Sequence, residues 1–560
     1  MTCKSACQCS FRMASNSSLM SRCLNGRICR VAFTRSLSSV WCSRSYSGIS
    51  IQKGELAAVL QADTVADTAS DNGRKKERVV ILGSGWAGYA LAHSLDPSKY
   101  ERVVISPRSY FVFTPLLAST AVGTLEFRTI LEPVRRLKEV DLYQGWADDI
   151  DFTNKTVLVE ANTADDLATK TIVSPTGGRP RVPGIKGKQY TVSYDKLAIA
   201  CGAYSQTFGI EGVREHAHFL RDIGDARRIR LRVLSLFEQC SHRSVDPANK
   251  STEDDTAGHL TDDDRRNLLH FAIVGGGPTG IEFAAELNDL IYEDLGPIYP
   301  DLLQFVQITV YDIAPKVLPM FDQVLAKYAM DTFARHGIQV RTEHHLERIR
   351  LADGPLGSEH GALKIKVREN GDEEVGAGLV VWSTGLMQNP LVSKLATKEF
   401  TLPSTETPQD PTPSRLLKDP KTGGLVTDAH LRARIDTPDG ATKVLDDVFV
   451  IGDCAAVAEN GRALPKTAQV ASQQAVYLAK RFNAGDVEAE PFRFRNWGTL
   501  TYLGSWKAIH QSAADSLKGR TAWIVWRGAY LTKSMSIRNK ILVPVYWIIS
   551  WIFGRGISRF

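Results

Sequence analysis

Cysteine is scarce in most of this chain of 560 residues. Six of its nine cysteines lie within the first 42 residues, so that only Cys201, Cys240 and Cys454 remain beyond them. These three form no CxxC pair, the spacing typical of zinc sites and redox disulfides, and they are too few for a disulfide framework. We therefore expect no metal site and no iron–sulfur cluster, and we expect the protein to work in a reducing compartment.

Acidic residues are absent from both ends of the chain. Residues 1–50 carry seven Lys and Arg but no Asp or Glu, and residues 516–560 carry eight Lys and Arg, again with no acid. Because the whole chain has a formal net charge of only +6, the stretch between the two ends is acidic. The two basic ends need separate explanations, and we expect no nucleic-acid partner.

The N-terminal end is rich in Ser and Arg as well as free of acid. This composition is typical of a mitochondrial transit peptide, whereas a secretory signal has a long apolar core after a short charged start. We interpret residues 1–50 as a transit peptide. The alternative is a disordered tail.

The chain also lacks an apolar run long enough to cross a membrane. Its most apolar segment, residues 541–553, has 13 residues and is interrupted by Pro544, whereas a spanning helix needs about 20 residues. Indole rings favour the headgroup level, and Lys and Arg bind anionic lipid. We predict that residues 520–560 form an amphipathic helical segment that lies on the membrane without crossing it. A buried dimerisation helix is the alternative, and the two can coexist. Four of the ten tryptophans lie in this segment: Trp523, Trp526, Trp547 and Trp551.

Glycine, by contrast, recurs at a fixed spacing directly after an apolar run. The apolar run "VVIL" meets Gly83-x-Gly85-x-x-Gly88, and a helix-like stretch and a second run, "RVVIS", follow. This order predicts a strand–turn–helix–strand unit. Its glycines allow a tight turn and the close approach of a pyrophosphate, whose charge lies at the helix N-terminus. A lone GxGxxG is weak evidence, but this context strengthens the prediction of a dinucleotide site.

A second unit of the same kind starts at residue 271. Its strand runs into Gly275-x-Gly277-x-x-Gly280, the helix "IEFAAEL" follows, and the next strand, "VQITVYDI", ends near Asp312. A carboxylate at that point accepts the ribose hydroxyls of NADH and repels the 2′-phosphate of NADPH. We therefore predict a preference for NADH. The intervening stretch "NDLIYEDLGPIYPDLLQF" is interpreted as a helical insertion. A surface acid at a strand end is the alternative reading of Asp312.

A late strand completes the pattern: "DDVFVIGDCAAV", residues 446–457, ends on Gly452 and Asp453. Two nucleotide units closed by such a strand resemble the glutathione-reductase-like flavoproteins, which bind two dinucleotides. The resemblance implies an α/β fold with two nested Rossmann-like domains, here followed by the C-terminal membrane-binding region. It also implies that the first domain binds FAD, that the second binds NAD(P)H, and that the Gly-Asp pair reaches the ribityl–phosphate chain.

The stretch after the second strand, "SPRSYFVFTPLLASTAVGTLEFR", contains no cysteine, which excludes the disulfide reductases of this superfamily. The same stretch resembles the type II (alternative, rotenone-insensitive) NADH:quinone oxidoreductases of respiratory membranes. So do "YDKLAIACGA", "GGGPTGIEFAAEL", "LPKTAQVASQQAVYLAK", "WGTLTYLGSWKAI" and the basic tail. The resemblance covers nearly everything from about residue 76 to the end, and it is strongest to mitochondrial fungal members.

This resemblance assigns roles to matching positions. Glu282 would lie near the contact between nicotinamide and flavin, as a tuner or proton relay, and Thr114 and Pro115 would pack beside the flavin ring. Ser106 stands where FAD domains usually place an acid for the ribose. The residues expected to bind FAD are Gly83, Ser84, Gly85, Trp86, Gly88, Ser106, Arg108, Thr114, Pro115, Gly452 and Asp453. Those expected to bind NADH are Gly275, Gly277, Pro278, Thr279, Gly280, Asp312 and Gly385.

Gln469 and Gln473 are assigned to the quinone site. Their segment contains good helix formers and no interior Gly or Pro, so the two residues are i and i+4 on one helix face. Two amides can donate to quinone carbonyls without adding charge. A polar helix face in solvent is the alternative.

The expected domains follow from these assignments. Their boundaries are 1–50 for the transit peptide, 76–240 for the first part of the FAD domain, 241–268 for a polar surface insertion, 269–440 for the NADH domain, 441–485 for the second part of the FAD domain with the quinone-site helix, and 490–560 for the membrane-binding region.

The expected reaction is NADH + H⁺ + ubiquinone → NAD⁺ + ubiquinol, without proton pumping, at the mitochondrial inner membrane. The resemblance implies a homodimer, and the leader is compatible with either face of that membrane. An NADH-sensing flavoprotein similar to apoptosis-inducing factor is one alternative. A sulfide:quinone oxidoreductase that uses Cys201 and Cys454 is another, although no third thiol is at hand.

Overall fold

The first glycine turn leaves the centre of a ten-stranded sheet. In the computed structural model, residues 76–162, 187–241, 260–402, 412–437, 442–459, 462–513 and 515–559 are described, and all of them belong to one compact unit, Ala62–Phe560. Strand β1 (Glu77–Leu82) pairs in parallel with β2 (Tyr100–Ser106) on one side and with β8 (Lys196–Ile199) on the other. The predicted transit peptide lies outside the described residues.

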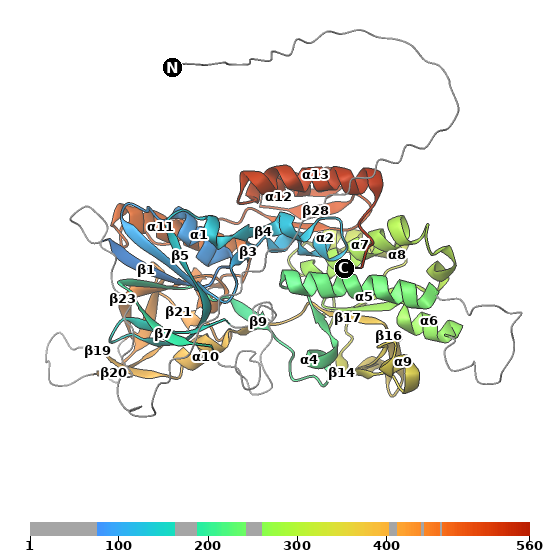
Figure 1. The fold of residues 1–560 in the computed structure, drawn as a ribbon, viewed down its shortest axis with the longest axis horizontal. Coiled ribbons are helices and arrows are strands. Elements are labelled where there is room, and N and C mark those ends of the chain that lie inside the picture. Colours follow the sequence, from blue (N-terminus) through green and yellow to red (C-terminus); the bar gives the residue numbers. More distant parts are fainter. Residues whose placement is uncertain are drawn as a thin grey trace, which may run out of the picture. The chain divides into compact units, whose positions relative to one another are not determined.

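Strand β1 is fully buried from Val79 onward, so both of its faces are covered by other elements. Helix α1 (Trp86–Ser94) follows the turn and packs against α11 (Ala468–Ala484), a helix almost four hundred residues later in the chain, as Figure 1 shows. Strand β23 (Thr442–Val450), which leads into the Gly452–Asp453 turn, pairs in parallel with β8. The late Gly-Asp turn is thereby brought to the same sheet edge as the first glycine turn.

The second glycine turn belongs to a separate five-stranded sheet with the order β10-β17-β11-β12-β13. Strand β11 (His270–Val274) is buried along its whole length and pairs in parallel with β12 (Gln307–Tyr311) and β17 (Leu379–Trp382). Helix α7 (Pro278–Asp289) follows the turn and continues as a π-helical segment, η5 (Leu290–Leu295). Parallel strands around each glycine turn, with helices between them, confirm the expected α/β class.

The strands of the two sheets are not divided at the expected domain boundaries. Strand β10 (His218–Phe219), inside the range 76–240, pairs with β17 of the second sheet. Strands β19 (Glu399–Leu402), β20 (Thr412–Leu416) and β22 (Arg432–Asp436), inside the range 269–440, extend the first sheet instead. Alternation of apolar residues indicates a strand but does not say which sheet edge it joins.

Part of the expected surface insertion, 241–268, is also an ordered element. Helix α6 (Asp262–Leu268) begins at a capping box, in which Thr261 and Asp264 satisfy each other's backbone N–H groups. Its last residue, Leu268, is fully buried. Asp262, Asp263 and Asp264 form the first turn of this helix, where carboxylates are favoured by the helix dipole.

The C-terminal region consists of a small antiparallel sheet and two helices. Strands β27 (Thr499–Tyr502), β28 (Ala508–Gln511) and β29 (Ser516–Gly519) lead into α12 (Arg520–Lys533) and α13 (Ile537–Phe553), which lie side by side in Figure 1. The helices are joined through the Arg527 guanidinium, which lies 4.3 Å from the ring centroids of both Trp523 and Trp547.

Pro544 does not interrupt the last helix, contrary to the expectation from sequence. Helix α13 has 17 residues and contains the proline in its interior. A proline there removes one backbone hydrogen bond, but Val543 and Trp547 on either side of it are buried against the body. Packing of this face holds the helix together. Among the described helices, none combines the length and apolarity needed to traverse a bilayer.

Helix α13 is held to the body by polar contacts at both ends. The buried Asn539 amide donates to Glu132 Oε1 at 2.7 Å, and the Ser550 hydroxyl donates to the Thr124 carbonyl at 2.9 Å. Beyond the helix, Arg555 pairs with Asp294 and Glu293 of the π-helical segment. The C-terminal segment is therefore fixed to the second unit and is not a free tail.

Candidate active site

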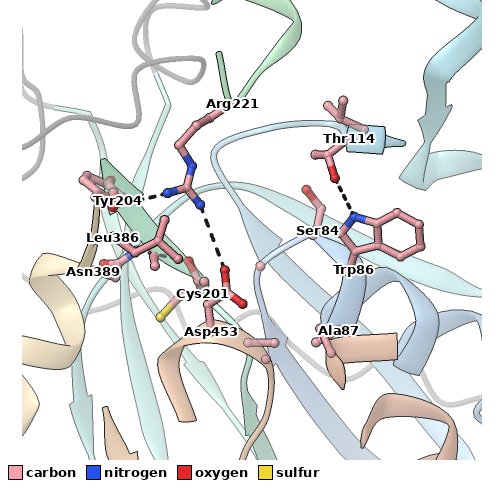
Figure 2. Close-up of a pocket in the computed structure, with 18 of the residues that line it drawn as sticks. Ser84, Trp86, Ala87, Thr114, Cys201, Tyr204, Arg221, Leu386, Asn389 and Asp453 are labelled. Carbon is pink, nitrogen blue, oxygen red and sulfur yellow. Dashed lines mark hydrogen bonds and ion pairs between the residues drawn. The ribbon is translucent and has the colours of Figure 1, made fainter. Parts of the chain in front are cut away.

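A single cavity of about 1250 Å³ extends between the two glycine turns. Ligand pockets for one small molecule measure roughly 300–1,000 Å³, so this cavity is large enough for an extended ligand or for two that meet. Figure 2 shows its wall near Trp86, Thr114, Arg221 and Asp453. Of the residues expected at the site, those that line the cavity are Gly83, Ser84, Gly85, Trp86, Ser106, Arg108, Thr114, Pro115, Pro278, Thr279, Glu282, Gly385, Gly452 and Asp453.

Each of the three glycines in the first turn is needed for a different physical reason. Gly83 has φ of +113°, and a Cβ there would lie 2.4 Å from the Ala200 carbonyl oxygen. A Cβ on Gly88 would lie 1.9 Å from the Gly83 oxygen, so this glycine packs the helix against the turn and does not line the cavity. Gly85 has no atom within 4 Å of an added Cβ. Its backbone faces open space at the N-terminus of α1, where an anion is favoured.

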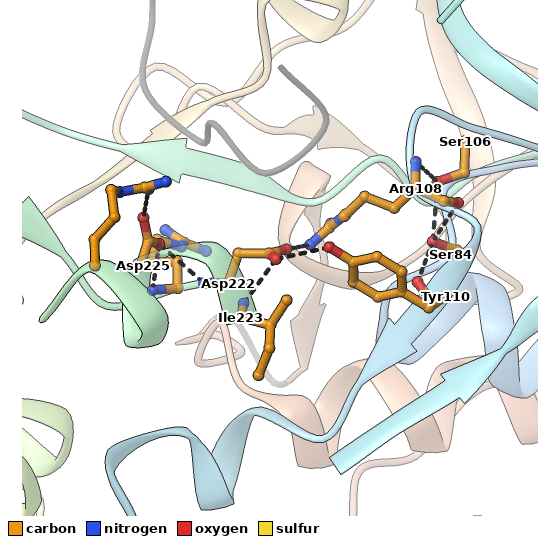
Figure 3. Close-up of polar contacts among 9 residues, drawn as sticks. Ser84, Ser106, Arg108, Tyr110, Asp222, Ile223 and Asp225 are labelled. Carbon is orange, nitrogen blue, oxygen red and sulfur yellow. Dashed lines mark hydrogen bonds and ion pairs between the residues drawn. The ribbon is translucent and has the colours of Figure 1, made fainter. Parts of the chain in front are cut away.

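The end of strand β2 carries hydroxyl and guanidinium groups instead of an acid. The Ser84 and Ser106 hydroxyls lie 2.9 Å apart, and Ser84 also hydrogen-bonds the Tyr110 carbonyl (Figure 3). The Arg108 guanidinium is paired with Asp222, a fully buried carboxylate that also accepts from the Tyr110 hydroxyl at 3.1 Å. Arg108 is thereby held in place on the cavity wall.

The Gly452–Asp453 turn is supported by two residues that the sequence did not point to. Gly452 N–H donates to Gln474 Oε1 at 2.7 Å, and Gln474 is buried on α11. The Asp453 carboxylate faces Arg221 (Figure 2), and its oxygen lies 4.0 Å from Arg221 Nη2. Burial raises the pKa of Asp453, and the nearby Arg221 opposes that shift. These contacts orient Asp453 on the wall shared with the first turn.

The second turn has the same construction. Gly275 has φ of +115°, and an added Cβ would meet Ser383 Oγ at 2.8 Å, whereas Gly277 is open. Asp312 accepts from the Gly276 and Ala314 backbone N–H groups, so its carboxylate is held against the turn. Four residues expected here do not line the cavity: Gly275, Gly277, Gly280 and Asp312.

Trp86 and Glu282 both line the cavity. Trp86 comes from the helix after the first glycine turn, and Glu282 from the helix after the second. The Trp86 indole donates to Thr114 Oγ1 at 2.9 Å, which fixes the short helical turn that carries Pro115 (η1, Thr114–Leu116). Glu282 Oε1 accepts from the Tyr502 N–H at 3.1 Å and from Trp526 Nε1 at 3.3 Å. Burial raises the pKa of Glu282 to about 8, so this side chain carries a proton at neutral pH.

Two more buried carboxylates continue from Glu282 along the same helix face. Glu286 accepts from the Ser119 hydroxyl at 2.5 Å and from Thr124 Oγ1 at 3.0 Å. Asp289 accepts from the Tyr502 hydroxyl at 2.7 Å and from the Ser505 N–H at 3.1 Å. The sequence contained a signal for them, because acids separated by four and three residues among apolar neighbours share one face of a helix.

Gln469 and Gln473 lie on one face of α11, but their amides are already hydrogen-bonded. Gln473 exchanges two hydrogen bonds with the Arg495 backbone, at 2.8 and 3.0 Å. Gln469 accepts from the Trp497 N–H at 3.2 Å. Both side chains fasten residues 495–498 to the helix, and neither lines the cavity, although their neighbours Ala468 and Ala471 do.

Two family models together match most of the chain. The model described as pyridine nucleotide-disulphide oxidoreductase matches residues 77–400, and the model of the NDH2 C-terminal domain matches residues 497–556. The first spans both glycine turns. The second spans the small sheet and the helices α12 and α13.

Individual proteins are similar over nearly the same range. A "probable NADH dehydrogenase" of Dictyostelium discoideum is 38% identical over 494 residues, 87% of this chain and 92% of its own length. The mitochondrial "external NADH-ubiquinone oxidoreductase 2" of Saccharomyces cerevisiae is 32% identical, over 88% of this chain and 84% of its own. The solved structure of NDH2 from Plasmodium falciparum in complex with NADH shares the fold, with a TM-score of 0.67 at 24% identity, over 86% of this chain and 100% of that one.

Proposed function

The chain belongs to the type II NADH dehydrogenase family of pyridine-nucleotide oxidoreductases, and from this premise we propose that it is a non-proton-pumping NADH:ubiquinone oxidoreductase of the mitochondrial inner membrane. The membership confirms the family expected from the sequence motifs, and a yeast mitochondrial enzyme is among the similar proteins. The observation that carries the proposal is one cavity that extends from the first glycine turn to the N-terminus of α7, with Glu282 on its wall and Trp526 of α12 against Glu282.

FAD fits the part of the cavity formed by the first unit. Bound there, FAD would take up a hydride equivalent from NADH and pass two electrons to the quinone. The open backbone at Gly85 would receive the pyrophosphate, Ser106 and Arg108 the ribose end, and Asp453 the ribityl hydroxyls. Trp86 and Thr114 fix the turn that carries Pro115, beside which the flavin ring would pack. Gly83, Ser84 and Gly452 would supply the remaining contacts, whereas Gly88 keeps helix α1 packed against the turn.

NADH fits against the second turn. Gly277 leaves the backbone open beside Pro278 and Thr279 at the N-terminus of α7, which suits a pyrophosphate. Asp312, held against the turn by two backbone N–H groups, would accept the ribose hydroxyls and disfavour a 2′-phosphate. Gly385 lines the cavity between the two units, where the nicotinamide would lie.

Glu282 is the residue proposed to act on the quinone. It is protonated at neutral pH because burial raises its pKa to about 8, and it lies between the cavity and Trp526 of α12. A protonated carboxyl can donate to a quinone oxygen and stabilise the charge that develops there. Gln469 and Gln473 belong to the same site in this proposal, where they hold residues 495–498 in place.

The membrane surface would be contacted by α12 and α13. On α13, Ile541, Val545, Ile548 and Ile552 recur at the spacing of one helix face, and all four are exposed. Exposed apolar side chains beside a surplus of Lys and Arg are typical of a helix that lies in the headgroup region. The same region would form the contact of the expected homodimer, which sedimentation in detergent with and without these side chains would test.

The experiment that tests the function is NADH oxidation by the purified, FAD-loaded protein, with and without a short-chain ubiquinone. We expect the quinone to accelerate NADH oxidation many-fold. A slow rate that the quinone leaves unchanged would instead favour an NADH-sensing flavoprotein, and acceleration by sulfide in place of NADH would favour a sulfide:quinone oxidoreductase.

A further inference from the structure

The Arg108–Asp222 ion pair joins two parts of the chain that belong to different sheets. Arg108 follows strand β2 of the ten-stranded sheet and lines the cavity. Asp222 comes after strand β10, which pairs with β17 of the five-stranded sheet, and it directly precedes helix α5 (Ile223–Ser241). Because α5 packs against β10 and β17, Asp222 is carried by the unit of the second glycine turn. One residue on the wall of the first nucleotide site is therefore held from the second unit.

Asp222 is fixed in its place by several donors, as Figure 3 shows. Its side chain is 0% exposed. One carboxylate oxygen accepts from the Tyr110 hydroxyl at 3.1 Å and from the Ile223 N–H at 2.7 Å, and the other accepts from Arg108 Nη1. Asp225 in turn accepts from the Asp222 N–H at 3.0 Å. The carboxylate can neither turn nor reach solvent, so the guanidinium paired with it is fixed as well.

The Arg108 guanidinium keeps donors for a ligand. A guanidinium carries N–H groups on all of its nitrogens, and the contact with Asp222 uses only Nη1. The Arg108 side chain is 26% exposed and lies on the cavity wall. Burial alone would lower the pKa of Arg108, but Asp222 and Tyr110 hold it above its usual value. Arg108 therefore presents a permanent positive charge to the cavity.

This charge stands near the point where other dinucleotide folds place an acid. A carboxylate at the end of the second strand ordinarily accepts the ribose hydroxyls, but here Ser106 occupies that position, with its hydroxyl 2.9 Å from that of Ser84. The Arg108 backbone N–H donates to Ser106 Oγ at 3.2 Å. A guanidinium beside two hydroxyls can donate to the oxygens of an AMP group, whose negative charge an arginine favours. Such recognition depends on the direction in which the guanidinium points.

We propose that Asp222 is a positioning residue of the FAD site: it directs the Arg108 guanidinium toward the adenosine half of the cofactor. The proposal rests on the proposed FAD site and not on the identity of the electron acceptor. Since Asp222 is carried by α5, the second unit completes the site of the first, and bound FAD would in turn hold the two units in one arrangement. Arg221, the residue before Asp222, makes a link of the same kind to Asp453.

A double-mutant cycle tests this role, with the Kd for FAD as its readout. The Kd of the full-length protein is measured by equilibrium dialysis for Asp222→Asn, for Arg108→Met and for the double variant. Each single substitution should weaken FAD binding roughly 10- to 100-fold, because each removes the directed charge. The double variant should bind FAD no more weakly than Arg108→Met alone, since Asp222 acts through Arg108.

Melting temperatures of the FAD-free proteins separate this role from a purely structural one. Asp222→Asn leaves Arg108 as a largely buried charge without its partner, whereas the double variant removes that charge, so the double variant should melt at a higher temperature than Asp222→Asn. Asp428→Asn is the matched control, because Asp428 is also paired with a half-buried arginine, Arg432, and neither of them lines the cavity. It should lower the melting temperature and leave the Kd for FAD at the native value.

The proposal is wrong if Asp222→Asn binds FAD as tightly as the native protein does. It is equally wrong if the losses of the two single variants multiply in the double variant, or if Asp428→Asn weakens FAD binding as much as Asp222→Asn, because Asp222 would then act on the fold and not through Arg108. A native protein that retains no FAD on dialysis would instead refute the proposed flavin site.

Discussion

Replacing Glu282 by Gln should change how the stability of the protein depends on pH. In the folded protein, burial raises the pKa of Glu282 to about 8 from the 4.5 of a free glutamate. A glutamine has nearly the same shape, and its carbonyl can still accept from the Tyr502 N–H and Trp526 Nε1. The substitution therefore removes the titration and keeps the contacts.

The sign of the effect follows from the raised pKa. Between the two pKa values the unfolded chain is ionised while the folded protein keeps its proton, so the contribution of Glu282 to folding stability is complete at low pH and is lost as pH rises toward 8. Each pH unit in this window costs about 1.4 kcal/mol. From pH 5 to pH 8 the native protein should thus lose on the order of 4 kcal/mol relative to Glu282→Gln.

The assay is the melting temperature of the FAD-loaded protein and of Glu282→Gln at several pH values between 5 and 8. The native curve should fall below that of the variant as pH rises, and the gap should stop growing above about pH 8. Asp289 titrates in both proteins, so its contribution cancels in the difference. Two curves that stay parallel over this range would show that Glu282 is already ionised in the folded protein, and the assignment of a proton to it would be refuted.

Three further outcomes are expected. Asp312→Asn should raise the use of NADPH relative to NADH about 10- to 100-fold, equivalent to 1–3 kcal/mol, because it removes the charge that repels a 2′-phosphate and can keep the Gly276 contact. Equal use of both nucleotides by the native enzyme would contradict this. Gln469→Leu or Gln473→Leu should slow quinone reduction in stopped-flow measurements and leave flavin reduction by NADH intact, since both amides hold residues 495–498; equal slowing of both steps would remove them from the acceptor site. Ile548→Glu with Ile552→Glu should weaken binding to anionic liposomes by roughly 1.5–3 kcal/mol per side chain and lower activity with long-tailed ubiquinone but not with ferricyanide; unchanged flotation with liposomes would place the membrane surface elsewhere.

Residues whose role is local could be predicted from the sequence. Gly83 and Gly275 occupy left-handed turns that a side chain would block, and such turns leave a fixed spacing in the chain. Asp312 directly follows the parallel strand β12, as its apolar run indicated, although a helical insertion separates that strand from α7. Its carboxylate is held against the second turn by the Gly276 and Ala314 N–H groups, and its ligand is a proposal.

Features that depend on distant partners could not be predicted. The hydrogen bonds of Gln469 and Gln473 to residues 495–498 come from a loop with no regular pattern. Gln474 and Arg221 support Asp453 only because α11 and the segment before α5 (Ile223–Ser241) meet at the same sheet edge. Pro544 lies within a helix because buried neighbours hold it there, which local propensity does not reveal.

One residue of α12, Trp526, contacts both the other C-terminal helix and a side chain of the cavity wall. Its ring lies 6.4 Å from that of Trp547 on α13, and its N–H donates to Glu282. Any displacement of the two helices changes the partner of the carboxyl that is proposed to meet the quinone. With the proposed attachment to lipid, membrane binding and readiness for catalysis would be thermodynamically linked. A bilayer that stabilises one arrangement of these helices would also select one state of Glu282, and by reciprocity an inhibitor bound beside Glu282 would alter the affinity of the protein for the bilayer.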